Sequence, residues 1–189
     1  MSAGEDKANL RSKVRARRLE VFRNHGAEAA QSLARHLMAI LENRPVMNVA
    51  GYWAVGSEID LTPVLNALDE EGWNVALPVV VENDAPLIFR RWHAGDELRD
   101  GPLQTLQPSA DREEMVPDVI LTPLLAFDDA GYRLGQGGGF YDRTLQKLKE
   151  REGGILSVGV AFSAQRVETV PRDEYDQRLD MIVTEKGRV

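Results

Sequence analysis

The feature that most constrains this chain is a glycine-rich stretch at residues 131–143, Gly-Tyr-Arg-Leu-Gly-Gln-Gly-Gly-Gly-Phe-Tyr-Asp-Arg. An apolar run at residues 119–127, typical of a buried strand, precedes it, and a segment with helical apolar spacing at 141–150 follows it. A strand, a glycine loop and a helix start in this order direct backbone N–H groups and a helix N-terminus towards one point. This arrangement suits a bound phosphate group.

The charged residues of this stretch strengthen the phosphate interpretation. Arg133 and Arg143 would add charge-assisted contacts to the phosphate oxygens. Asp142 would be repelled by phosphates unless a cation lay between them, and a carboxylate together with phosphates is a common way to hold Mg²⁺. The alternative is a mobile surface turn with solvated charges, but three consecutive glycines between a strand and a helix favour a ligand site. The spacing fits neither a Walker loop nor the GxGxxG signature.

Composition restricts the class of protein. The 189 residues indicate one domain, 1–189, and the 28% charged and 43% hydrophobic residues are typical of a globular protein. The net charge of −7 argues against nucleic acid as a partner. The absence of cysteine excludes thiol catalysis and cysteine–zinc sites, and the three histidines are scattered without ligand spacing. We expect small-molecule partners and a monomer or weak dimer.

The sequence offers no membrane signal. Its apolar stretches are shorter than the roughly 20 residues that span a bilayer. The arginine-rich N-terminal region resembles a transit peptide, but Glu5, Asp6 and the missing apolar segment argue against that. We therefore expect no membrane partner and a cytoplasmic location.

Two amphipathic helices are predicted at the start, at residues 7–24 and 27–42, the second ended by Asn43-Arg44-Pro45. On the first, Lys7, Arg11, Arg15 and Arg18 recur on one face as a cationic stripe. A solvated charged face is the simpler interpretation for most of these side chains. Because the stripe has few acidic neighbours in an acidic protein, contact with a bound anion is the second interpretation.

The next segments predict an α/β fold. A strand at 46–53, a helix capped by Thr62 with Pro63 at its first position and ended by Gly72, and a strand at 75–81 form a β-loop-α-β unit. Further strands are expected at 87–92, 155–162 and 181–184. We predict a three-layer, Rossmann-like fold: a mostly parallel sheet with helices on both faces. Residues 95–118 are irregular, and long loops of this kind are often functional.

Ligands of such folds bind at the carboxyl ends of the strands. The glycine loop follows one strand, and Glu58 follows the strand that ends near Tyr52 and Trp53. A glutamate in such a loop is usually solvated. Its place on the predicted ligand edge makes it a site candidate.

Several motifs in order resemble the 5-formyltetrahydrofolate cyclo-ligases, also called methenyltetrahydrofolate synthetases. The glycine stretch resembles that family's ATP loop, and Lys7-Ala-Asn-Leu-Arg11 resembles its N-terminal Lys-x-x-x-Arg. The remaining matches are Glu58-Ile59-Asp60 after Tyr52-Trp53, Leu77-Pro78, residues 123–128, Phe162-x-x-Gln165, Val170-Pro171, Asp176 and Asp180. Together they cover nearly the whole chain.

The resemblance implies an ATP- and Mg²⁺-dependent enzyme that cyclises 5-formyltetrahydrofolate to 5,10-methenyltetrahydrofolate, releasing ADP and phosphate through a phosphorylated formyl oxygen. Arg133 and Tyr141 would be catalytic, and Asp142 and Asp176 would hold Mg²⁺. The residues implied to bind ATP are Lys7, Arg11, Arg133, Leu134, Gly135, Gln136, Gly137, Gly138, Gly139, Phe140 and Tyr141. Those implied to bind the folate are Trp53, Glu58, Gln136, Gly137, Gly138, Gly139 and Phe140.

Two departures and two alternatives accompany this resemblance. Phe140 replaces a frequent tyrosine, which would remove a hydroxyl contact, and residues 100–115 are too divergent to carry site residues across. A nucleotide- or folate-binding module of the same fold with little turnover is the first alternative. A sugar-phosphate enzyme is the second, although it gives no reason for two widely separated carboxylates and a cationic N-terminal helix.

Overall fold

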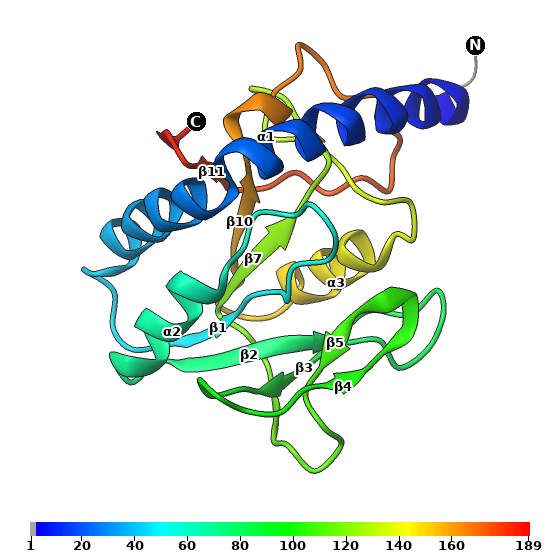
Figure 1. The fold of residues 1–189 in the computed structure, drawn as a ribbon. Coiled ribbons are helices and arrows are strands. Elements are labelled where there is room, and N and C mark those ends of the chain that lie inside the picture. Colours follow the sequence, from blue (N-terminus) through cyan, green and yellow to red (C-terminus); the bar gives the residue numbers. More distant parts are fainter. Residues whose placement is uncertain (1–2) are drawn as a thin grey trace.

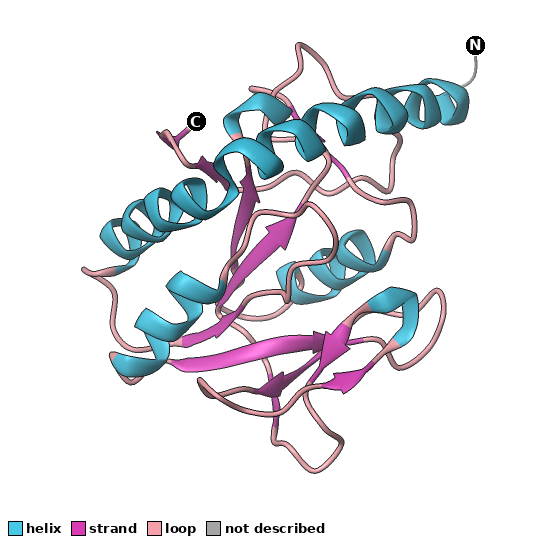
Figure 2. Cartoon of the chain, in the orientation of Figure 1, coloured by secondary structure: helices cyan, strands magenta, loops and turns pink. Residues whose placement is uncertain are grey.

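The computed structural model describes residues 3–189 as a three-layer α/β structure. The helices α1 (Ala3–Leu41) and α2 (Thr62–Glu70) cover one face of a central sheet, and α3 (Phe140–Lys149) covers the other (Figure 1; Figure 2). The predicted Rossmann-like class is confirmed. Among the described residues, no helix has both the length and the apolar character needed to cross a membrane.

The central sheet has eight strands in the order β12-β11-β10-β7-β1-β2-β3-β6. Their bounds are β1 Asn48–Ala50, β2 Asn74–Val79, β3 Ile88–Arg91, β6 Glu114–Met115, β7 Val119–Pro123, β10 Leu156–Ala161, β11 Met181–Thr184 and β12 Gly187–Arg188. The strands from β11 to β2 run parallel, and β12, β3 and β6 join antiparallel.

Two short ladders lie outside this sheet. One pairs β4 (Arg99–Asp100) with β5 (Leu106–Gln107), with a 3-10 turn, η1 (Pro102–Gln104), between them. The other pairs β8 (Ala126–Phe127) with β9 (Arg133–Leu134). A second 3-10 turn, η2 (Ser163–Gln165), follows β10.

Apolar side chains alternate between the two faces of the sheet along the buried strands and form one hydrophobic core on each face. On β7, Val119 and Leu121 face the α1–α2 layer and Ile120 faces the α3 layer. All three are fully buried, as a parallel strand covered on both faces requires. The alternation therefore decides which side of the sheet each helix covers.

The N-terminal region is one continuous helix, so the prediction of two helices at 7–24 and 27–42 was wrong. Gly26, where the break was expected, lies inside α1. A helical glycine costs about 1 kcal/mol relative to alanine, which tertiary packing readily outweighs. Leu33 and Leu37 pack on the main core, whereas Val14 packs on a separate cluster with Leu134 and Val170. The two halves of α1 are held by different surfaces.

Two boundary predictions also need correction. The expected strand at 46–53 is only Asn48–Ala50, and the expected strand at 119–127 divides into β7 and β8. Thr62 is the first helical residue rather than the cap. Its N–H and its hydroxyl both donate to Asp60 Oδ1, at 2.8 and 2.7 Å, because a carboxylate two residues earlier reaches these groups.

Gln165 holds the ends of two core strands together. Its Nε2 donates to the carbonyls of Leu124 (2.7 Å) and Leu125 (3.0 Å), and its Oε1 accepts from Phe162 N–H (2.8 Å), all in the interior. We expect Gln165→Leu to lower the free energy of unfolding by about 2–4 kcal/mol, because it leaves buried polar groups unpaired. Urea unfolding measures this, with exposed Gln31→Leu on α1 as the matched control. A loss below about 0.5 kcal/mol, the range of an ordinary surface substitution, would contradict the assignment.

Candidate active site

A cleft of about 1030 Å³ opens at the carboxyl ends of β1 and β7. Here the chain order reverses, because β1 pairs with β2 on one side and with β7 on the other. Such a switch point is where open parallel sheets leave a crevice for a ligand. The N-terminal half of α1, the loop after β1, the β4–β5 ladder, the glycine loop and residues 173–176 contribute its walls.

The structure brings together every residue that the sequence assigned to the site. These residues line the cleft: Lys7, Arg11, Trp53, Glu58, Arg133, Leu134, Gly135, Gln136, Gly137, Gly138, Gly139, Phe140, Tyr141, Asp142 and Asp176. They come from regions far apart in the sequence. Their individual roles stay predictions.

The glycine loop is attached to α1 by the cationic stripe. Arg11 Nε donates to the carbonyl of Gly135 (3.0 Å), and Arg15 Nη2 donates to Gln136 Oε1 (3.0 Å). The glycine loop follows the short strand β9, whereas the sequence predicted that it would directly follow the buried strand at residues 119–127. Two members of the stripe, Arg11 and Arg15, thus contact the loop. The simpler prediction of a solvated face is wrong for Arg11, for Lys7, which pairs with two carboxylates, and for Arg18, which is buried.

Gly137 has a backbone conformation that side chains disfavour, with φ +114°, and its missing Cβ would lie 3.6 Å from Arg11 Cζ. We expect Gly137→Ala to weaken the binding of a phosphate ligand in the cleft roughly 10- to 100-fold by displacing the loop amides. The melting temperature should change little, because the loop lies outside the core. Gly135→Ala is the control that adds the same methyl group without backbone strain. The φ of Gly135 is not positive, and the space around the added Cβ is open. Equal losses in the two variants would refute the conformational explanation.

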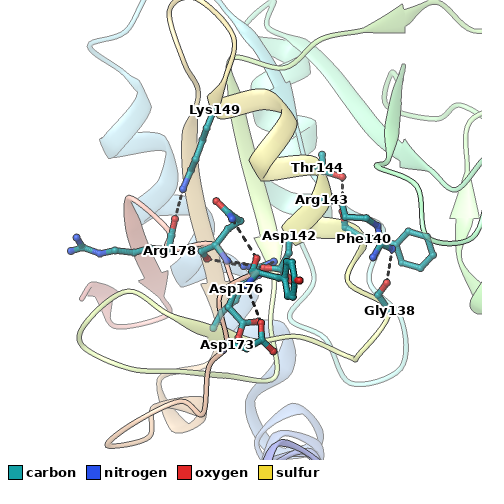
Figure 3. A network of polar contacts seen from close by, with 12 residues as sticks. Gly138, Phe140, Asp142, Arg143, Thr144, Lys149, Asp173, Asp176 and Arg178 are labelled. Carbon is teal, nitrogen blue, oxygen red and sulfur yellow. Dashed lines mark hydrogen bonds and ion pairs between the residues drawn. The ribbon is translucent and has the colours of Figure 1, made fainter. Parts of the chain in front are cut away.

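The start of α3 completes the loop. Gly139 is the N-cap residue, with φ +66° and no side-chain hydrogen bond to the helix amides. Arg143 folds back over the loop, where its Nη2 donates to the carbonyl of Gly138 (2.7 Å) and its guanidinium lies 5.3 Å from the centre of the Phe140 ring (Figure 3). The helix N-terminus therefore faces the cleft among cations, as an anion site requires.

Carboxylates and cations meet at the other side of this helix start. Lys7 Nζ lies 2.8 Å from Asp173 Oδ2 and 2.6 Å from Asp176 Oδ2, and Arg133 Nη2 lies 2.9 Å from Asp142 Oδ1. Gln177 N–H, next to Asp176, also donates to Asp142 Oδ1 (3.0 Å), so the two carboxylates predicted to hold a metal lie at one place (Figure 3 labels both).

The electrostatics of Lys7 follow from these contacts. Burial acts to lower the Lys7 pKa, but hydrogen bonds and attraction from Asp173 and Asp176 outweigh it and raise the pKa. The hydrogen bond from Lys7 lowers the pKa of Asp173. Lys7 is therefore a cation and Asp173 an anion at neutral pH.

Glu58 lines the cleft from the loop after β1, and its carboxylate is largely buried. Its Oε2 accepts from the N–H of Val55 (3.0 Å), and its Oε1 lies 3.8 Å from Arg18 Nη1. Burial raises the Glu58 pKa, while the bond from Val55, the charge of Arg18 and a hydrogen bond with Gln136 oppose the increase. An acceptor in a partly apolar wall can recognise the N–H groups of a flat heterocycle.

Aromatic side chains form the apolar part of the cleft. Burial, followed by the nearby negative charge of Glu58, raises the pKa of both Tyr52 and Tyr141. Tyr141 is therefore a protonated phenol that can donate but not act as a base at neutral pH. Trp53 lies edge-on to Trp92 with ring centres 6.1 Å apart, which fixes its orientation.

Some lining residues were missed by sequence reasoning. Leu103, Thr105 and Leu106 enter the cleft from the β4–β5 ladder, and Asp173 enters beside Asp176. The sequence did not indicate the ladder residues as site residues, because apolar and polar residues do not alternate regularly in that segment. Asp173 lies three residues before a predicted ligand, and its contact with Lys7 depends on the tertiary fold alone.

Comparison with known proteins identifies the family of this chain. The sequence profile of the 5-formyltetrahydrofolate cyclo-ligase family matches residues 3–185. The chain belongs to this family. The family name describes a ligase, and the resemblance inferred from the motifs is confirmed.

Individual relatives agree. A 5-formyltetrahydrofolate cyclo-ligase from Haemophilus influenzae is 31% identical over 95% of this chain and 98% of its own length. One from Escherichia coli K12 is 35% identical over 90% of this chain and 96% of its own. The NMR structure of Aquifex aeolicus 5,10-methenyltetrahydrofolate synthetase superposes with a TM-score of 0.82 at 34% identity, over 96% of this chain and 91% of that one. These relatives are similar to this chain in sequence, and the solved one is also similar to it in fold.

Proposed function

We propose that this chain, as a single domain over residues 1–189, uses ATP to convert 5-formyltetrahydrofolate into 5,10-methenyltetrahydrofolate, with ADP and phosphate as the other products. One observation supports the proposal most: Lys7 and Arg11 of α1 lie in the same cleft as the glycine loop, together with Glu58 and Trp53 from the loop after β1. The cleft thus has a cationic, amide-rich end for a triphosphate and a partly apolar end for a folate. Its volume lies at the upper end of ordinary ligand sites.

The proposed chemistry needs no nucleophile from the protein. A formamide carbon is a poor electrophile, so the formyl oxygen first attacks the γ-phosphorus of ATP and ADP leaves. N10 of the folate then attacks the activated carbon and closes the ring, N10 releases its proton to water, and phosphate departs with the former formyl oxygen. The residues of the chain mainly position the two substrates and neutralise charge.

Each wall has a distinct task in this proposal. Lys7, Arg11 and Arg133 would bind phosphate oxygens, together with the amides of residues 134–141. Tyr141, held protonated, would donate to an oxygen that gains negative charge. Glu58 would accept hydrogen bonds from the folate ring and Trp53 would pack against it.

The donor set fits Mg²⁺ when phosphates are present. The contacts of Asp142 in the described part of the chain are made by Oδ1, and those of Asp176 by Oδ2. This leaves a second oxygen on each. Among the side chains that the structure describes, those of residues 7–189, no group of three or more His, Cys, Asp or Glu is suited to a metal, so phosphate oxygens and water would complete the octahedron. When bound, Mg²⁺ would supply Lewis-acid stabilisation of the phosphate charge.

A binding module without turnover is the second candidate, and one assay separates the two. We expect the absorbance of methenyltetrahydrofolate to grow when the protein is mixed with Mg-ATP and 5-formyltetrahydrofolate, and not when ATP is omitted. Tight ATP binding without absorbance growth would favour the module. Action in the cytoplasm, and a monomer or weak dimer, stay predictions of the sequence.

A further inference from the structure

The side chain of Arg18 is a buried cation without a full set of partners. It is 5% exposed, and its Nε donates to Ser57 Oγ at 3.0 Å. Its Nη1 has no hydrogen-bond partner among the described residues, although that nitrogen is shielded from solvent. An unpaired buried donor on a charged group costs free energy, so its retention calls for an explanation.

The nearest opposite charge is Glu58, whose Oε1 lies 3.8 Å from this nitrogen. Both side chains line the cleft. The distance is too long for a hydrogen bond but short enough for strong attraction in a poorly hydrated wall. Arg18 therefore stabilises the charge of Glu58 without itself forming a hydrogen bond to Oε1.

We propose that Arg18 is a positioning residue for folate binding: it keeps Glu58 ionised and directed into the cleft, and acts on the substrate through that carboxylate rather than by touching it. This inference rests on the proposed function, since it takes the folate as the ligand of Glu58. The sequence alone did not indicate this role, because it showed Arg18 only as one member of the cationic stripe.

Other groups around Glu58 do not replace Arg18. The polar and titratable side chains that surround this carboxylate or influence its neighbours are Arg18 and Arg15 of α1, Tyr52 and Asp60 of its own loop, Arg133 of β9, Gln136 of the glycine loop and Tyr141 of α3. Arg133 acts on Tyr141 and is paired with Asp142. Arg15 is bonded to Gln136, Asp60 is bonded to Thr62, and the tyrosines are neutral. Arg18 is thus the cation that opposes the effect of burial on the Glu58 pKa.

The test measures folate binding without ATP, so that turnover is not required. Trp53 in the cleft wall provides a fluorescence signal for titration with 5-formyltetrahydrofolate between pH 6 and 8.5. We expect Arg18→Met to weaken binding about 10-fold or more at pH 6 and only about two- to threefold at pH 8.5, because each unit by which the Glu58 pKa rises shifts the midpoint of the pH profile by one unit. Arg18→Lys should restore most of the wild-type profile, since it restores the charge.

A double-mutant cycle decides whether Arg18 acts through Glu58. In a Glu58→Gln background, adding Arg18→Met should change the Kd less than twofold, and the pH dependence should be absent in both. This double variant also removes the risk of misfolding, because no carboxylate is left buried without its counterion. Arg17→Met is the matched control: Arg17 is exposed and donates to the carbonyls of Ala164 and Arg166, outside the cleft.

Each outcome is decisive. Additive losses in the cycle, or an Arg18→Met loss that is equal at all pH values, would overturn the inference in favour of direct contact or plain packing. A wild-type protein that binds the folate but never forms methenyltetrahydrofolate would refute the proposed function and leave this inference standing. A wild-type protein that does not bind the folate would refute both.

Discussion

Replacement of Asp142 by Asn is expected to lower kcat roughly 10²–10³-fold at low Mg²⁺ concentration, the loss typical of removing one electrostatic partner from a reacting phosphate. The isosteric amide keeps an oxygen for Gln177 N–H, and Arg133 Nη1 still donates to the carbonyl of Gln177 (3.1 Å). The protein should therefore fold. The methenyltetrahydrofolate absorbance, followed as Mg²⁺ is varied, should show a partial recovery at high concentration.

The matched control for this experiment is Asp129→Asn. Asp129 is an exposed carboxylate that pairs with Arg166 at the surface, so the same change of charge occurs outside the cleft. Its rate should equal that of the wild type. Wild-type kcat in Asp142→Asn at low Mg²⁺ would remove Asp142 from the site.

Replacement of Lys7 by Met is expected to lower kcat/KM for ATP roughly 10²–10³-fold while the KM for the folate changes little. The ammonium now lies between Asp173 and Asp176, and it would turn to the phosphates when these carboxylates meet a cation. Its loss removes a phosphate contact and leaves two carboxylates that repel the nucleotide. Steady-state kinetics with each substrate varied in turn separate the two constants.

Two further variants sharpen the Lys7 experiment. Lys7→Arg keeps the charge and should recover part of the loss, although its planar group differs in shape. Lys13→Met removes an exposed lysine from the same helix and should leave both constants unchanged. If Lys7→Met raised the KM for the folate by as large a factor as it lowered kcat/KM for ATP, Lys7 would be shown to organise the whole cleft rather than the phosphate end alone.

Much of the fold could be predicted from the sequence, because the elements with strong local patterns are also those that tertiary packing preserves. The strand at 181–184 and a helix after the glycine loop appeared as expected. The division of 119–127 into β7 and β8 could not be predicted, since pairing of Ala126 and Phe127 with Arg133 and Leu134 involves partners that the local pattern does not specify. The continuity of α1 through Gly26 depended likewise on surfaces far along the chain.

The sequence by itself determined the chemistry that the chain can carry: an amide-rich loop, a cationic stripe and isolated acids, with no thiol. The tertiary structure decided which of these groups meet. Lys7 and Asp176 are 169 residues apart, and no local rule fixes their 2.6 Å contact. Arg18 differs from its exposed neighbour Arg17 only in the direction that α1 gives it. The sequence specifies the identity of each side chain. Desolvation and charge pairing determine what that side chain does, and both arise only when the sheet and α1 have packed together.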